Sequence, residues 1–116
     1  MSARLFLAFA AIACCATQGL AHAFLQRAAP GAGAKLSAAP KTVALTFSEK
    51  LEPAFSGVAV TDMAGRSVVS APAVIAGTSM VARLGLLKPG SYRVTWHAVS
   101  VDTHRTEGAY SFMVKP

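Results

Sequence analysis

The sequence predicts an all-β domain, a two-sheet antiparallel sandwich of the immunoglobulin-like type with about seven strands. Two observations carry this prediction. From residue 23 onward, short β-type runs, several of which alternate apolar and polar residues, are each followed by turn residues, a pattern typical of sandwiches and barrels. No stretch of this region shows helical periodicity of useful length.

The alternating runs define the expected strands and the expected core. Strands are predicted at residues 24–28, 42–47, 56–61, 67–71, 79–84, 91–98 and 108–114. Pro72 ends the fourth run, which favours an edge strand or a crossover there. Four aromatic side chains fall on the alternating faces that a core demands: Phe47, Tyr92, Trp96 and Phe112.

Length and charge limit the classes of function. A chain of 116 residues is expected to form one domain. Its net charge of +6 comes from single basic residues scattered between apolar ones. Because no basic stripe and no recognisable module is visible, nucleic acid is excluded as a partner. Weak attraction to an anionic membrane surface is left open.

The N-terminal segment has the layout of a secretory signal peptide. Arg4 precedes an uncharged apolar run over residues 5–16, and small residues follow near Ala21. The run is shorter than the roughly 20 residues that a spanning helix needs. We therefore expect an exported protein from which this N-terminal signal peptide is removed. Cys14 and Cys15 would be lost with the signal peptide; an acylated Cys14 is the alternative.

The cleavage position decides whether His22 is retained. Cleavage after Ala21 makes His22 the first residue of the exported chain. Cleavage after Ala23 uses the small residues Ala21 and Ala23 around His22, and local sequence alone slightly favours it.

The candidate metal ligands are few. Asp102 and His104 lie two residues apart after a predicted strand, a weak signal when taken alone. A terminal His22 would add its α-amine and its Nδ1, giving three nitrogens and one oxygen in total, a donor set that suits Cu(II). Soft Cu(I) has little to bind, since the only methionines beyond the first residue are scattered: Met63, Met80 and Met113.

Other polar residues have simpler interpretations. His97 is on the opposite strand face from Trp96 and is expected to be exposed to solvent. Glu49 follows a strand, as a solvated turn residue or a group at the rim of the sandwich, and Glu107 is expected to be solvated. No nucleophile elbow with a Ser-His-Asp set is present, and no glycine-rich phosphate loop precedes a helix.

An ordered series of short motifs extends through the chain from residue 22 to residue 114. In order they are His22-Ala23-Phe24-Leu25, Pro30-x-x-Gly33-Ala34-x-Leu36, Ala39-Pro40, Leu45-x-Phe47-Ser48-Glu49, Leu87-x-Pro89-Gly90-x-Tyr92-x-Val94-x-Trp96 and Val99-Ser100-x-Asp102-x-His104. In this series the chain resembles the CopC family of periplasmic copper-binding proteins.

The resemblance implies a Greek-key sandwich of the immunoglobulin-like or cupredoxin-like type without enzymatic activity. It implies that His22, Asp102 and His104 bind one Cu(II) ion per chain, with Glu49 and Trp96 near the site. It also favours cleavage after Ala21, which makes residues 1–21 the signal peptide and residues 22–116 a copper-binding domain in the periplasm. Two departures stand out. The methionine-rich loop of some members is absent, and Arg105 replaces the proline that many members have after the motif histidine.

The leading hypothesis is a monomeric carrier or buffer of Cu(II) in copper resistance or homeostasis. Its implied partner is an inner-membrane copper transport protein of the CopD type. Two alternatives come from other classes: a copper-dependent oxidase of the lytic monooxygenase type, and a metal-free immunoglobulin-like interaction module. The oxidase is disfavoured because so small a domain has little room for a flat polysaccharide-binding face.

Overall fold

A computed structural model describes residues 23–116; the predicted signal peptide and His22 lie outside the described residues. The described chain forms eight strands and one short 3-10 helix, η2. They are β1 (Leu25–Ala29), β2 (Lys35–Leu36), β3 (Thr42–Phe47), η2 (Pro53–Phe55), β4 (Gly57–Asp62), β5 (Val74–Ala76), β6 (Ser79–Arg83), β7 (Gly90–Val99) and β8 (Arg105–Val114).

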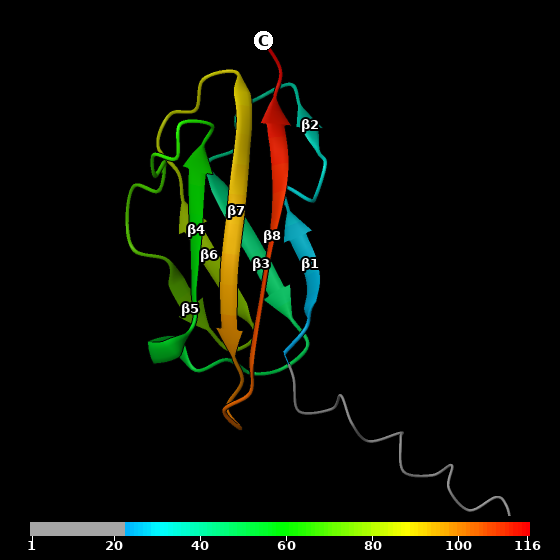
Figure 1. Cartoon of the computed structure of the whole chain (residues 1–116), viewed down its shortest axis with the longest axis vertical. Helices are drawn as coiled ribbons and strands as arrows, with labels where there is room; N and C mark the ends of the chain where they lie inside the picture. Colours follow the sequence, from blue (N-terminus) through cyan, green and yellow to red (C-terminus); the bar gives the residue numbers. More distant parts are fainter. Residues whose placement is uncertain (1–22) are drawn as a thin grey trace, which may run out of the picture.

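The strands form two four-stranded sheets, which confirms the predicted all-β sandwich (Figure 1). One sheet has the order β1-β3-β6-β5 and is antiparallel throughout. The other has the order β2-β8-β7-β4, with β2 parallel to β8 over two residues and the remaining pairs antiparallel. The chain changes sheet at every connection from β1 to β5 and again between β6 and β7, while β5 and β6 share one sheet and β7 and β8 share the other.

The predicted core residues lie between the sheets. Each strand that alternates in sequence buries its apolar face, because successive side chains of a strand point to opposite sides. Phe47 packs edge-on against Trp96 across the sandwich, with ring centroids 5.1 Å apart. Tyr92 stacks on Phe112 at 5.5 Å. Burying each such side chain is worth about 2 kcal/mol.

The prediction of a strand at residues 67–71 is wrong. Only isolated bridges occur there, from Ser67 to Thr61 and from Val69 to Leu84. The physical reason is that this segment crosses between the sheets. The amide of Val68 donates to Val60 in one sheet, and the amide of Ser70 donates to Arg83 in the other. Neither sheet can therefore continue its ladder through the segment.

Other differences are small. The sequence prediction missed β2 and β5, and β8 begins at Arg105 rather than at Gly108. β2 contributes two residues and β5 three, too few for a visible alternation. Within residues 23–116, no helix has the length and the apolar character that a membrane crossing needs.

Candidate metal site

A tight turn joins β7 to β8 at one end of the sandwich and carries both predicted ligands. The amide of Ser100 donates to the carbonyl of His104 at 3.0 Å, and the amide of Thr103 donates to the carbonyl of Ser100 at 2.8 Å. Thr103 has a φ of 74°, a left-handed conformation that is unusual for a β-branched residue. This backbone brings Asp102 and His104 to the same side of the turn.

The two side chains meet at the surface. Nδ1 of His104 lies 3.4 Å from Oδ1 of Asp102, and the side chains are 51% and 49% exposed, so a metal ion in solution can reach both. The hydroxyl of Ser100, which is buried beneath the turn, donates to the same carboxylate. This hydrogen bond, together with the neighbouring His104, lowers the pKa of Asp102 below 3.8, although desolvation opposes the shift.

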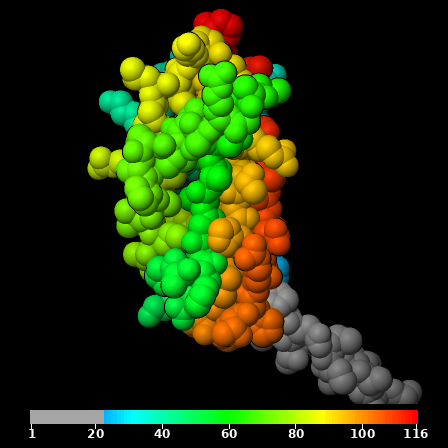
Figure 2. Space-filling view, turned by 60° about the vertical axis from the view of Figure 1, so that its left-hand side comes forward, coloured from blue at the N-terminus to red at the C-terminus, as the bar shows by residue number. Residues whose placement is uncertain are grey.

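The turn is supported by the segment that follows β3. The amide of Val101 donates to the carbonyl of Lys50 at 3.1 Å, and Leu51 pairs with Ser100. The space-filling view shows the blue-green region around η2 against the orange turn (Figure 2). Glu49 belongs to this segment and is half-buried. Among the described residues, however, no three His, Cys, Asp or Glu side chains group closely enough to hold a metal, so Glu49 does not complete a site with Asp102 and His104.

The first described residues are held beside the same turn. Ala23 is fully buried, and its carbonyl accepts a hydrogen bond of 2.7 Å from the hydroxyl of Thr106, two residues after His104. Phe24 and Ser48 are joined by two hydrogen bonds of 2.8 Å, one from the Phe24 amide to Ser48 Oγ and one from the Ser48 amide to the Phe24 carbonyl. His22, the third predicted ligand, immediately precedes the anchored residues Ala23 and Phe24 in the sequence.

The residues near the end of β7 have structural roles. Trp96 is 8% exposed and lies on the inner face of its sheet, four residues before Ser100. His97 was expected to be exposed but is half-buried, because its ring lies over the backbone of Gly57. A Cβ on Gly57 would come within 2.9 Å of the His97 ring.

Arg105 and Glu107 form an exposed ion pair on β8, with 3.5 Å between Nε of Arg105 and Oε2 of Glu107. Glu107 is therefore exposed, as expected, but has a partner. Arg105 occupies the first position of β8, directly after His104.

Two contributors to the site were missed by the sequence analysis. Ser100 belongs to the quoted motif, yet its place two residues before Asp102 was the only signal that it could orient the carboxylate. Thr106 had no sequence signal at all. Its contact with Ala23 spans 83 positions and depends on the topology of the fold.

The sequence model of the CopC domain matches residues 25–115. The chain belongs to the CopC family. Protein YobA of Escherichia coli K12 is 41% identical over 99 residues, which cover 82% of this chain and 80% of YobA. Copper resistance protein C of Escherichia coli is 37% identical, with 86% of each chain covered.

Solved structures and a longer relative agree with this assignment. The crystal structure of CopC from Methylosinus trichosporium OB3b has a TM-score of 0.75 at 36% identity and covers 82% of this chain and 95% of its own. Copper transport protein CutJ of Bacillus subtilis is 31% identical over 81% of this chain, a match that occupies 18% of CutJ. The relatives whose names state a role are copper resistance and copper transport proteins, not enzymes, as the sequence predicted.

Proposed function

We propose that this protein binds one Cu(II) ion and acts as a periplasmic copper carrier or buffer in copper resistance or homeostasis. The observation that carries the proposal is the meeting of two chain segments at one end of the sandwich. The turn that holds Asp102 and His104 lies beside the anchored residue Ala23, which directly follows His22.

The donor chemistry supports copper in its oxidised form. Asp102 supplies an anionic oxygen, and its lowered pKa keeps the carboxylate ionised through the physiological range. His104 supplies an imidazole nitrogen. Nitrogen and carboxylate donors without a thiolate suit Cu(II) rather than Cu(I).

The third ligand is His22, through its α-amine and Nδ1, once the signal peptide is cleaved after Ala21. The anchor supports this assignment. Consecutive Cα atoms are about 3.8 Å apart, so a residue directly before Ala23 has little freedom to leave this end of the molecule. The resulting site would join a freed N-terminus to an internal turn.

The carrier role is supported by the kinds of proteins that contain a related segment. The match to CutJ, which is named a copper transport protein, occupies under a fifth of that chain. A CopC-like unit therefore occurs within a longer transport protein. We propose that the present protein, as a monomer, delivers copper to an inner-membrane transport partner of the CopD type.

A titration of the mature protein with Cu(II) tests the site. Trp96 is the only tryptophan and lies on the strand that leads into the turn, so binding should quench its fluorescence with an end point at one copper per chain. His104→Ala should weaken binding by about 100-fold or more, because it removes a direct ligand. His97→Ala is the matched control and should change affinity little. Equal losses in both variants would show that the ligand assignment is wrong.

The mass of the exported protein tests the third ligand separately. A chain that begins at His22 supports the proposal. A chain that begins at Phe24 contradicts it, because the chelating amine and imidazole would both be gone.

A further inference from the structure

Charge is distributed unequally between the two ends of the sandwich. We define the copper pole as the half that contains the turn of residues 100–104, and the far pole as the opposite half, where β3 and β7 begin and β6 and β8 end. The far pole has one carboxylate, Asp62, and seven cations: Lys35, Lys41, Arg66, Arg83, Lys88, Arg93 and Lys115.

The copper pole has the opposite balance. Among residues 23–116, its three cations are Arg27, Lys50 and Arg105, and its four carboxylates are Glu49, Glu52, Asp102 and Glu107. Counted over the described residues 23–116, the far pole therefore has a formal charge of +6 and the copper pole one of −1. The surplus charge that looks scattered in the sequence is concentrated by the fold at the end away from the copper ligands.

The cations of the far pole remain available to a partner. All seven side chains are exposed. Oδ1 of Asp62 accepts hydrogen bonds from the amides of Ala64 and Arg66, which occupy it within its own turn. In the part of the chain that the structure describes, the only ion pair that involves lysine or arginine is that of Arg105 with Glu107, at the copper pole.

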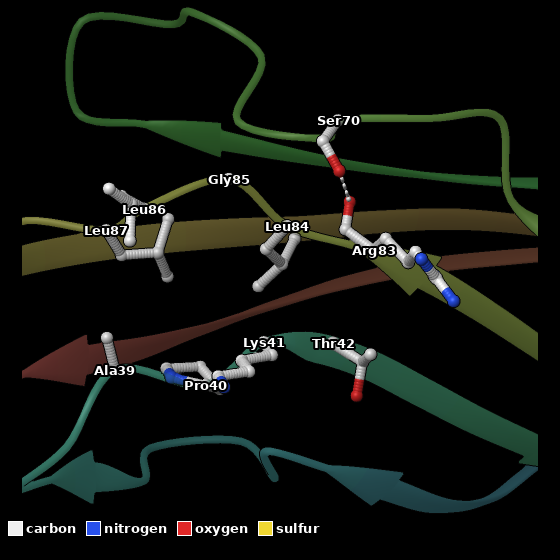
Figure 3. A pocket seen from close by; sticks show the side chains of 10 residues that line it. All are labelled: Ala39, Pro40, Lys41, Thr42, Ser70, Arg83, Leu84, Gly85, Leu86 and Leu87. Carbon is white, nitrogen blue, oxygen red and sulfur yellow. Dashed lines mark hydrogen bonds between the residues drawn. The ribbon is translucent and has the colours of Figure 1, made fainter.

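An apolar hollow of about 600 Å³ opens among these cations. Figure 3 shows Leu84, Leu86 and Leu87 on one wall, across from Pro40 and Lys41 on the other. Leu86 is 103% exposed, more than any other large apolar side chain in residues 23–116. Lys41 and Arg83 line the hollow, and Lys88 follows Leu87 directly, so Arg83 and Lys88 flank the three leucines in the sequence.

We propose that the far pole docks on a membrane surface of anionic phospholipid. A fully exposed leucine among clustered lysine and arginine side chains has the character of an interfacial anchor, in which the apolar group enters the acyl boundary and the cations contact headgroups. A charge spread over the whole end of a molecule fits a uniformly charged sheet of headgroups better than a single acidic site. This docking directs Asp102 and His104 away from the lipid and toward copper in solution. It requires no bound copper.

Vesicle co-sedimentation of the copper-free mature protein tests the docking. Vesicles of equal parts phosphatidylglycerol and phosphatidylcholine should bind the protein at low salt, and vesicles of phosphatidylcholine alone should not. Binding should fall steeply near 0.5 M salt, because screening shortens the reach of the charges to roughly a few ångströms. Neutralising Lys41, Arg83 and Lys88 together as glutamine should weaken binding on the order of 100-fold, since each cation contributes roughly five-fold.

Matched variants separate this surface from the overall charge. Leu86→Ser should weaken binding several-fold, whereas Phe55→Ser, which alters an exposed apolar residue at the copper pole, should not. Copper affinity should be unchanged in the triple glutamine variant.

Three results would overturn the proposal. One is the absence of binding to phosphatidylglycerol vesicles at low salt. Another is an equal loss of vesicle binding in Leu86→Ser and Phe55→Ser. The third is binding of poly-glutamate that is as tight as vesicle binding and depends on Leu86, which would make the far pole a site for an acidic protein instead.

Discussion

Ser100 connects the backbone of the β7–β8 turn to the acidity of the Asp102 carboxylate. Its buried hydroxyl donates to Asp102, and this hydrogen bond is the largest cause of the lowered pKa of Asp102. Ser100→Ala should therefore raise the pKa of Asp102 toward 3.8. An NMR titration of the Asp102 carboxyl carbon in the copper-free protein measures the change directly.

The same variant should release copper at a higher pH than the wild type, because protons compete with the metal for the carboxylate. Ser91→Ala, at the other end of β7, serves as the control and should leave both titrations unaltered. An unchanged pKa of Asp102 in Ser100→Ala would show that the hydroxyl does not control the carboxylate.

Gly108 is required by the packing of Trp96 against β8. A Cβ on Gly108 would lie 2.6 Å from Cζ2 of the indole, and the ring cannot retreat because Phe47 packs against it. Gly108→Ala should destabilise the fold by about 1–3 kcal/mol, measured by urea unfolding. Gly31→Ala is the control, since its Cβ would meet only the Ala28 carbonyl at 3.6 Å. Equal stability of the two variants would contradict this account.

At the scale of elements, Tyr110 fastens β8 to the loop that follows β1. Its hydroxyl donates to the carbonyl of Pro30 at 2.8 Å, and burial raises its pKa from 10.0 to about 12. The pKa of Tyr110 is therefore higher in the folded chain than in the unfolded chain. Its phenol contributes fully to the free energy of unfolding below pH 10, and this contribution is lost as the pH rises toward about 12. Tyr110→Phe should be less stable than the wild type at neutral pH by about 1 kcal/mol.

The gap in the free energy of unfolding between Tyr110→Phe and the wild type should narrow across this alkaline range, because only the wild type has a phenol at position 110 that can ionise. Urea unfolding at a series of pH values from neutral to strongly alkaline measures the gap. A gap that stays constant up to pH 12 would mean that Tyr110 ionises equally easily in the folded and unfolded chains.

The predictability of each strand from sequence follows from what its faces contact. β3 was predicted with its observed bounds, because one face meets the core and the sequence alternates accordingly. The segment 67–71 contains the β-branched residues Val68 and Val69, yet it divides its hydrogen bonds between two sheets, a property of the topology that no local pattern reports. β5 pairs with β6 over three residues, and its position depends on that partner rather than on its own sequence.

The candidate metal site was likewise predictable from sequence only in part. The proximity of Asp102 and His104 could be predicted, because two positions in one turn are necessarily close. The position of Ala23 beside Thr106 could not, since it requires β1 and β8 to begin at the same end of the sandwich. For His97, the strand face was predicted correctly but the burial was not. Gly57 on the neighbouring strand has no side chain, so the His97 ring lies over its backbone and is half-buried.

At the scale of the whole molecule, the proposed copper site connects the start of the exported chain to a turn about eighty positions later. A ligand that binds only the folded state stabilises it, by about 2.7 kcal/mol at a concentration one hundred times Kd. Copper should therefore raise the melting temperature of the mature protein. An alanine added before His22 converts its α-amine into a peptide nitrogen, so the copper-dependent rise should shrink sharply while the copper-free melting temperature stays the same.

Thermal unfolding with and without Cu(II) measures both quantities. The control is an alanine added after Pro116, because the end of β8 lies at the far pole and such an addition leaves the ligands untouched. The two extended proteins have the same composition and differ only in which pole is altered. If copper stabilised both equally, the N-terminal amine would have no part in the site, and Asp102 and His104 would have to bind copper with ligands other than the start of the chain.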